Sequence, residues 1–113
     1  MLDPQAIELF KLQAEICKTL ADPNRLMLLH LLRGGEKSVS QLVDSLRLPQ
    51  SNVSRHLAVL RERSLVETRR EGTTIFYRMA NPKISEACDL VREVLQSQLN
   101  RNQALVNSLN THV

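Results

Sequence analysis

A mainly α-helical fold with one small β-hairpin is predicted by three features of this sequence. Most of the chain places apolar residues at helical spacing, one stretch after residue 64 switches to β-branched and aromatic residues, and the core has to be almost entirely aliphatic. The 113 residues are 42% hydrophobic and include only three aromatic side chains. This length fits a small core, so we expect residues 1–113 to form a single domain.

The first two helices are predicted from proline positions and from helical periodicity. Pro4 suits the first turn of a helix over residues 4–20, and the Asp22-Pro23 pair should end that helix. A second helix is expected over residues 24–32, with apolar residues around much of its circumference, and it should therefore be central and buried. Gly34 and Gly35 are its stop signal.

Two short helices joined by a tight turn are expected next. Ser38 can cap a helix over residues 39–46, and Pro49 separates this helix from the following one, for which residues 50–52 supply N-cap candidates. Only four residues lie between the two helical patterns. This arrangement indicates a helix-turn-helix, in which the second helix reads the major groove and the first lies across the DNA backbone.

The helix after Pro49 has a polar face that suits DNA. Val53, Leu57 and Leu60 fall in one narrow sector and can anchor the helix to a core. An ordinary amphipathic surface helix would look the same, so the neighbouring elements have to decide between the two interpretations. If it is a recognition helix, the groove contacts are Ser51, Asn52, Ser54 and Arg55, and Gln50 and His56 help to fix the helix to the backbone.

A hairpin is predicted directly after this helix. Residues 65–70 and 74–79 are rich in β-branched and aromatic residues, and Glu71-Gly72-Thr73 separates them. A two-stranded hairpin is marginal alone, so we expect it to pack on the helices. A helix-turn-helix followed by such a hairpin is a winged helix-turn-helix, with the order α-α-α-α-β-β-α. We expect Arg69, Arg70 and Thr73 of this wing to hold phosphate or the minor groove.

Positive charge is concentrated in the same region. The formal net charge is +3, but the segment from Arg47 to Arg78 contains seven arginines and three glutamates, giving +4, and the rest of the chain sums to −1. Arginine suits bidentate contacts to phosphate or guanine, so the distribution favours a DNA partner.

A long last helix is expected over about residues 83–109. Its stripe has a spacing close to 3.5 residues and comprises Ile84, Cys88, Val91, Leu95, Gln98 and Asn102. A monomer of this size cannot cover so long a helix. We therefore expect a homodimer through the first and last helices, whose paired recognition helices match a pseudo-palindromic operator.

These segments resemble the ArsR/SmtB family of bacterial winged-helix repressors. The resemblance covers nearly the whole chain and is carried by DPNRL at residues 22–26, by Ser51, Ser54, His56, Leu57 and Leu60 in the pattern SxxSxHLxxL, by SLVETRREG at residues 64–72, and by a YR strand. It implies a homodimeric DNA-binding repressor that leaves its operator when an effector binds, often a metal ion or a thiol-reactive species.

The sequence departs from the sensor sites of that family. Ser38 and Ser40 stand where one group of metal sensors has thiolates, and hydroxyls do not replace soft ligands. The positions of the zinc ligands in the last helix align with Asn81, Lys83, Val94 and Ser97, which cannot form a zinc cage. His30 and a position near Gln96 stand where sulfur sensors have cysteines. We therefore assign no cofactor.

Cys17 and Cys88 leave two interpretations open. Both lie on apolar stripes of the terminal helices and can simply be small packing residues. Alternatively, they approach each other and bind a thiophilic metal or metalloid, or react with sulfur species or oxidants, which would shift the recognition helices.

Other function classes have less support. The N-terminus lacks a secretory signal and no stretch is long and apolar enough for a membrane span, so we expect a cytoplasmic protein without a membrane partner. No catalytic constellation or phosphate-binding glycine loop is present, and an enzyme is not expected. The alternative that remains is a winged-helix regulator or interaction module without metal or thiol sensing.

Overall fold

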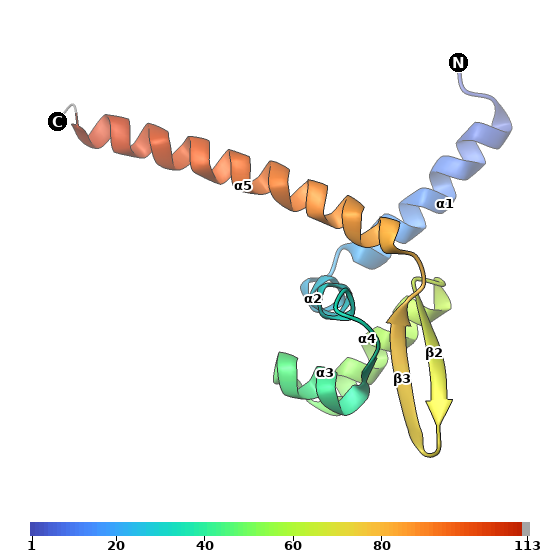
Figure 1. Ribbon diagram of the computed structural model, residues 1–113. Coiled ribbons are helices and arrows are strands. Elements are labelled where there is room, and N and C mark those ends of the chain that lie inside the picture. Colours follow the sequence, from blue (N-terminus) through green and yellow to red (C-terminus); the bar gives the residue numbers. More distant parts are fainter. Residues whose placement is uncertain (112–113) are drawn as a thin grey trace. The chain divides into compact units, whose positions relative to one another are not determined.

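The computed structural model describes residues 1–111 and contains two compact units, Met1–Pro82 and the segment from Lys83 onward (Figure 1). The elements in chain order are α1 (Pro4–Leu20), α2 (Pro23–Leu32), β1 (Lys37–Ser38), α3 (Val39–Leu46), α4 (Gln50–Glu62), β2 (Val66–Glu71), β3 (Thr74–Met79) and α5 (Pro82–Thr111). The predicted winged helix-turn-helix is confirmed, and the first unit holds the helix-turn-helix and the wing. Within residues 1–111, no helix combines the length and the apolar character that crossing a bilayer requires.

Aspartate-proline pairs start the first two helices. The Asp3 carboxylate accepts the N–H of Ala6 at 2.8 Å, and the Asp22 carboxylate accepts the N–H groups of Asn24 and Arg25 at 2.8 and 3.3 Å. Burial raises the pKa of Asp22, but the N–H donors of Arg25 and Asn24 outweigh it and leave the pKa below its ordinary value. The Asp22-Pro23 pair therefore both ends α1 and caps α2, because proline occupies the first helical position of α2.

The core of the first unit is aliphatic, as its composition predicts. Its buried members come from α2, α3, α4, the residue before β2 and the start of β2, and they are Leu28, Leu29, Leu32, Leu42, Val53, Leu57, Leu60, Leu65 and Val66. Helix α2 contacts α1, α3, α4 and β3, which confirms the expectation that it is central. The apolar stripe predicted for α4 is the side of the helix that enters this core.

The two helices of the helix-turn-helix, α3 and α4, have different N-terminal caps. Ser38 and Gln41 form a capping box on α3, with each side chain bonded to the other residue's backbone N–H. The polar residues 50–52 were expected to cap α4, and this is wrong: Pro49 occupies the N-cap position without a side-chain bond. Its carbonyl accepts the N–H groups of Asn52 and Val53, so the polar side chains at the start of α4 stay available.

The wing belongs to a three-stranded sheet, which corrects the expected two-stranded hairpin. Strand β1 pairs with β3 in the order β1-β3-β2, with Lys37 opposite Tyr77 and Ser38 opposite Phe76. Strands β2 and β3 are joined by Gly72 and Thr73, and Gly72 has φ of +62°, which glycine adopts without strain. A strand of two residues leaves no alternating pattern in the sequence, so periodicity could not reveal β1.

Helix α4 ends in a Schellman motif that contains a strained serine. The N–H of Ser64 donates to the carbonyl of Arg61, and the N–H of Leu65 donates to the carbonyl of Leu60, both at 2.9 Å. Ser64 holds the left-handed φ of +58° that this motif requires. Glycine is the residue that adopts this conformation at least cost.

We expect Ser64→Gly to stabilise the first unit by about 0.5–1 kcal/mol, because the left-handed strain is relieved and exceeds the entropic cost of glycine. Thermal unfolding at fixed protein concentration should show a midpoint raised by about 2–5 °C. The matched control is Ser45→Gly, at an exposed position inside α3, which should lower the midpoint. A lower midpoint for Ser64→Gly would contradict the assigned backbone conformation.

Candidate DNA-binding interface

The polar face of α4 is exposed where the sequence predicts groove contacts. Ser51, Ser54 and Arg55 are exposed, and Asn52 is half-buried at the edge of the same face. On the other side of the helix, Val53 and Leu57 are fully buried. The helix is therefore fixed to the core by one side and offers hydroxyls, an amide and a guanidinium on the other, in an arrangement that can reach base edges or phosphates.

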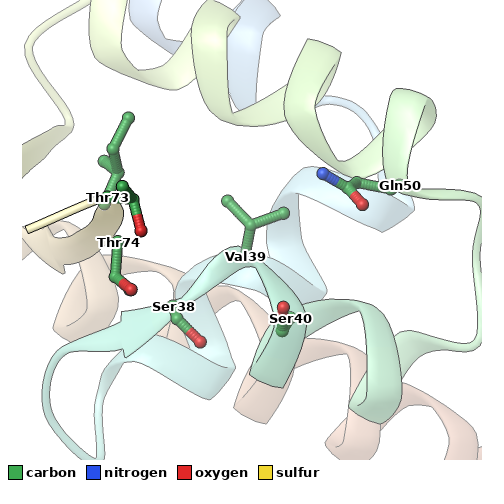
Figure 2. A pocket seen from close by; sticks show the side chains of 7 residues that line it. Ser38, Val39, Ser40, Gln50, Thr73 and Thr74 are labelled. Carbon is green, nitrogen blue, oxygen red and sulfur yellow. The ribbon is translucent and has the colours of Figure 1, made fainter.

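A polar hollow of about 270 Å³ lies next to the start of α4. It is lined by residues from three segments, namely Ser38, Val39 and Ser40 of β1 and α3, Gln50 of α4, and Thr73, Thr74 and Ile75 at the tip of the wing. Figure 2 shows these side chains around the opening, with Val39 between Gln50 and the threonines. Gln50 and Thr73, two of the residues predicted to contact DNA, both line this hollow, and the lining contains no acidic side chain.

His56 does not lie on the exposed face, which corrects its expected contact with the DNA backbone. Its side chain is only 6% exposed, and its Nε2 atom lies 3.5 Å from the side-chain nitrogen of Asn24 in α2. Its Nδ1 atom is buried without a hydrogen-bond partner among the described residues. His56 therefore ties α4 to α2, and its position beside the apolar stripe favours this packing role.

The arginines of the basic segment fall into two groups. Three of them pair with glutamates: Arg63 with Glu15, Arg69 with Glu36 and Glu71, and Arg78 with Glu67. Among the residues that the structure describes, the other four form no ion pair, and they are Arg47, Arg55, Arg61 and Arg70. Arg47 lies in the turn before α4, Arg55 and Arg61 lie on α4, and Arg70 lies on the wing. Within the basic segment, the positive charge available to an anion is therefore concentrated on α4 and its two flanks.

Several residues of this region were not found by sequence reasoning. Ser38 and Ser40 were considered only as a cap and as replacements for thiolates, yet both line the hollow. Thr74 lines it too. Glu36 was not considered, and its carboxylate binds Arg69 from the loop before β1. Only the missed pairing of β1 with β3 brings this loop to the wing, so the sequence carried no signal for it.

The cysteines lie in different units of the structure. Cys17 is exposed on α1, Cys88 is half-buried on α5, and neither forms a disulfide. In residues 1–111, no group of three or more histidine, cysteine, aspartate or glutamate side chains is arranged to hold a metal ion.

Comparison with known proteins connects this interface to a family. The model of the bacterial regulatory protein arsR family matches residues 22–68, which contain the helix-turn-helix and the first half of β2. The HTH-type transcriptional regulator Rv0081 of Mycobacterium tuberculosis is 40% identical over 102 residues, which are 89% of this chain and 90% of the relative. The chain belongs to the ArsR family. Like its relatives, this ArsR protein is a transcriptional regulator of the DNA-binding helix-turn-helix class.

Solved structures of similar proteins have the same fold. The crystal structure of M. tuberculosis Rv0081 matches with a TM-score of 0.75 at 38% identity, over 89% of this chain and 98% of that one. A homodimeric winged helix-turn-helix DNA-binding domain from Mycobacterium bovis matches with a TM-score of 0.76 at 31% identity, over 88% and 92%. The transcriptional repressor BigR from Xylella fastidiosa matches with a TM-score of 0.72 at 35% identity, over 83% and 96%.

Proposed function

We propose that this ArsR protein is a homodimeric repressor that binds a pseudo-palindromic operator and leaves it when an effector acts. The observation that carries the proposal is the exposed, carboxylate-free face formed by the start of α4 and the adjoining hollow. An interaction module that had lost DNA binding would be free to accumulate acidic side chains there, and this face has none among the described residues.

The groove contacts come from the first turns of α4. Arg55 is exposed and forms no ion pair with any residue from 1 to 111, so its guanidinium is available for the O6 and N7 atoms of a guanine. Ser51, Asn52 and Ser54 supply smaller donors and acceptors on the same face and leave the approach of the helix to the groove unobstructed. These residues are proposed to carry sequence discrimination.

The hollow beside α4 is proposed as a seat for a backbone phosphate. Its hydroxyls from Ser38, Ser40, Thr73 and Thr74 and the amide of Gln50 can all donate to phosphate oxygens. Because three segments of the first unit converge there, a phosphate held in the hollow would fix the orientation of α4 and of the wing together. Such contacts position the protein on the duplex without reading its sequence.

Repression and release are the finer parts of the proposal. A dimer seated on an operator excludes other proteins from the same DNA, and the similarity to the repressor BigR supports this direction of regulation. The chain has only two cysteines, Cys17 and Cys88, and these thiols are proposed as the groups that respond to a thiophilic metal, a reactive sulfur species or an oxidant.

We expect Arg55→Ala to lower affinity for a selected duplex by about 1–3 kcal/mol and to lower affinity for random DNA much less. The matched control is Arg61→Ala, which removes the same charge from an exposed position further along α4. Duplexes are selected from a random pool with the wild-type protein, and both variants are titrated by fluorescence anisotropy against selected and random DNA. Equal loss of discrimination in the two variants would exclude Arg55 as the reading residue.

A further inference from the structure

Arg69 is enclosed by carboxylates and by an aromatic ring on one face of the wing. Its Nε and Nη2 atoms donate to the carboxylate of Glu36 at distances from 2.5 to 3.2 Å, and Nη1 donates to Glu71 at 2.9 Å. The guanidinium carbon lies 4.8 Å from the ring centroid of Phe76, which is the residue directly opposite Arg69 on β3. One face of this guanidinium and most of its donors are therefore engaged within the protein.

This arrangement ties all three strands together. Glu36 directly precedes β1, Phe76 lies on the central strand β3, and Arg69 lies on β2. The ion pair consequently spans the width of the sheet, with the Phe76 ring in the middle strand. Hydrogen bonding from Arg69 lowers the pKa of Glu36 below its ordinary value, so this carboxylate is charged at neutral pH and the bridge persists.

The face of the sheet that carries Arg69 has no unpaired arginine. Directly opposite residues of an antiparallel pair share a face, so Glu67, Arg69 and Glu71 of β2 lie with Arg78 of β3. With Glu36 this face has two arginines against three glutamates, a net charge of −1, and both arginines are paired. A phosphate approaching it would meet a surface that repels anions.

Arg70 lies on the opposite face. It is the cross-strand partner of Ile75, and Ile75 lines the polar hollow beside α4. The same face contains Val66, which is buried in the core, so it is the face turned toward the helices. Arg70 is exposed and forms no ion pair among the described residues, which leaves its full charge next to the hollow.

We propose that Arg69 is a positioning residue that braces the wing and that Arg70 alone of the two supplies the wing's contact to DNA phosphate. The inference rests on the proposed function, because it assigns different roles to two arginines of the same DNA-binding interface. The sequence analysis expected Arg69 and Arg70 both to contact DNA, and this inference replaces that expectation. Glu36 becomes part of the DNA-binding machinery without touching DNA, since it holds Arg69 in the brace.

The test measures how binding depends on salt, because each phosphate contact adds a counterion-release contribution. The full-length protein and its variants are titrated by anisotropy against a mixed-sequence duplex of about 30 base pairs, at KCl concentrations from about 50 to 200 mM. Arg70→Ala should reduce the slope of log K against log[salt] by about 1 per protomer. Arg69→Ala should leave the slope unchanged and should instead accelerate amide hydrogen exchange in β2 and β3.

Two further variants separate a brace from a contact. Glu36→Gln should increase affinity and steepen the slope, because Arg69 is then partly free to reach phosphate. The double variant Glu36→Gln with Arg69→Gln keeps the net charge of the wing and should retain the wild-type slope. If Arg69→Ala acted only by disturbing the fold, Glu36→Gln would not be expected to increase the affinity for DNA.

The outcomes distinguish this inference from the proposed function. A wild-type protein that binds the duplex without salt dependence would overturn the proposed function and this division of roles with it. Salt-dependent wild-type binding, with slopes reduced equally by Arg69→Ala and Arg70→Ala and unchanged by Glu36→Gln, would leave the proposed function standing and overturn the brace.

Discussion

Leu57→Ala is expected to lower the free energy of unfolding of the first unit by about 2–5 kcal/mol. Leu57 is completely buried on the core side of α4 and packs among leucines and valines that fill most of the aliphatic core. Removing its side chain gives up the transfer free energy of three carbon atoms and leaves a cavity in a small core that has few large neighbours to fill it. For a unit of this size such a loss is a large fraction of the total stability.

The measurement is urea unfolding followed by circular dichroism at one fixed protein concentration, because assembly would make stability depend on concentration. Arg61→Ala, at an exposed position near the end of the same helix, is the control and should change stability by no more than about 0.5 kcal/mol. If Leu57→Ala also changed the free energy of unfolding by no more than about 0.5 kcal/mol, α4 would not be anchored to the core by its apolar stripe.

The parts of the fold that could be predicted are those specified by local sequence. Asp22 and Pro23 end one helix and start the next through hydrogen bonds that span only two or three residues. The spacing of Val53, Leu57 and Leu60 places them on one side of α4 whatever that helix packs against. Gly72 identifies the turn of the wing because few other residues adopt its conformation.

The parts that could not be predicted depend on contacts between distant segments. His56 lies at the edge of an apolar stripe, and only the position of Asn24, 32 residues earlier, makes it a core residue. Strand β1 has no pattern of its own and exists because β3 offers it a free edge. The number of arginines in the basic segment could be counted, but their pairing with Glu15 and Glu36 depends on tertiary structure.

The sequence therefore predicted which residues belong to the candidate site, and the structure corrected which of its arginines carry an unneutralised charge. Sequence alone treats Arg69 and Arg70 as equivalent, because they are adjacent and identical. The alternation of side chains along β2 separates them by putting one on each face of the sheet, and the glutamates then decide which of the two is neutralised. Two identical residues that are adjacent on a strand lie on opposite faces of the sheet, so they should not be assumed to have the same role.

The largest effect on DNA binding is expected from variants of α5. Leu95 and Leu99 are each more than half exposed, on a stripe that continues through Val91, Val106 and Leu109, all of them exposed too. We propose that a second copy of the chain covers this stripe. Leu95→Glu combined with Leu99→Glu would place two carboxylates from each chain in that apolar contact, where their desolvation is not compensated. The variant should be monomeric and should bind a two-half-site operator at least about 100-fold more weakly, since each half-site is then bound independently.

The matched control is Ser97→Glu combined with Asn100→Glu, which adds the same two charges on the opposite side of α5. Because both double variants repel DNA equally through their net charge, a difference between them isolates the contact between chains. Light scattering gives the mass of each variant and anisotropy gives its affinity for the operator and for an isolated half-site. If the Leu95 and Leu99 variant stays dimeric, or if both variants lose the same affinity, the stripe on α5 is not the surface that pairs two chains.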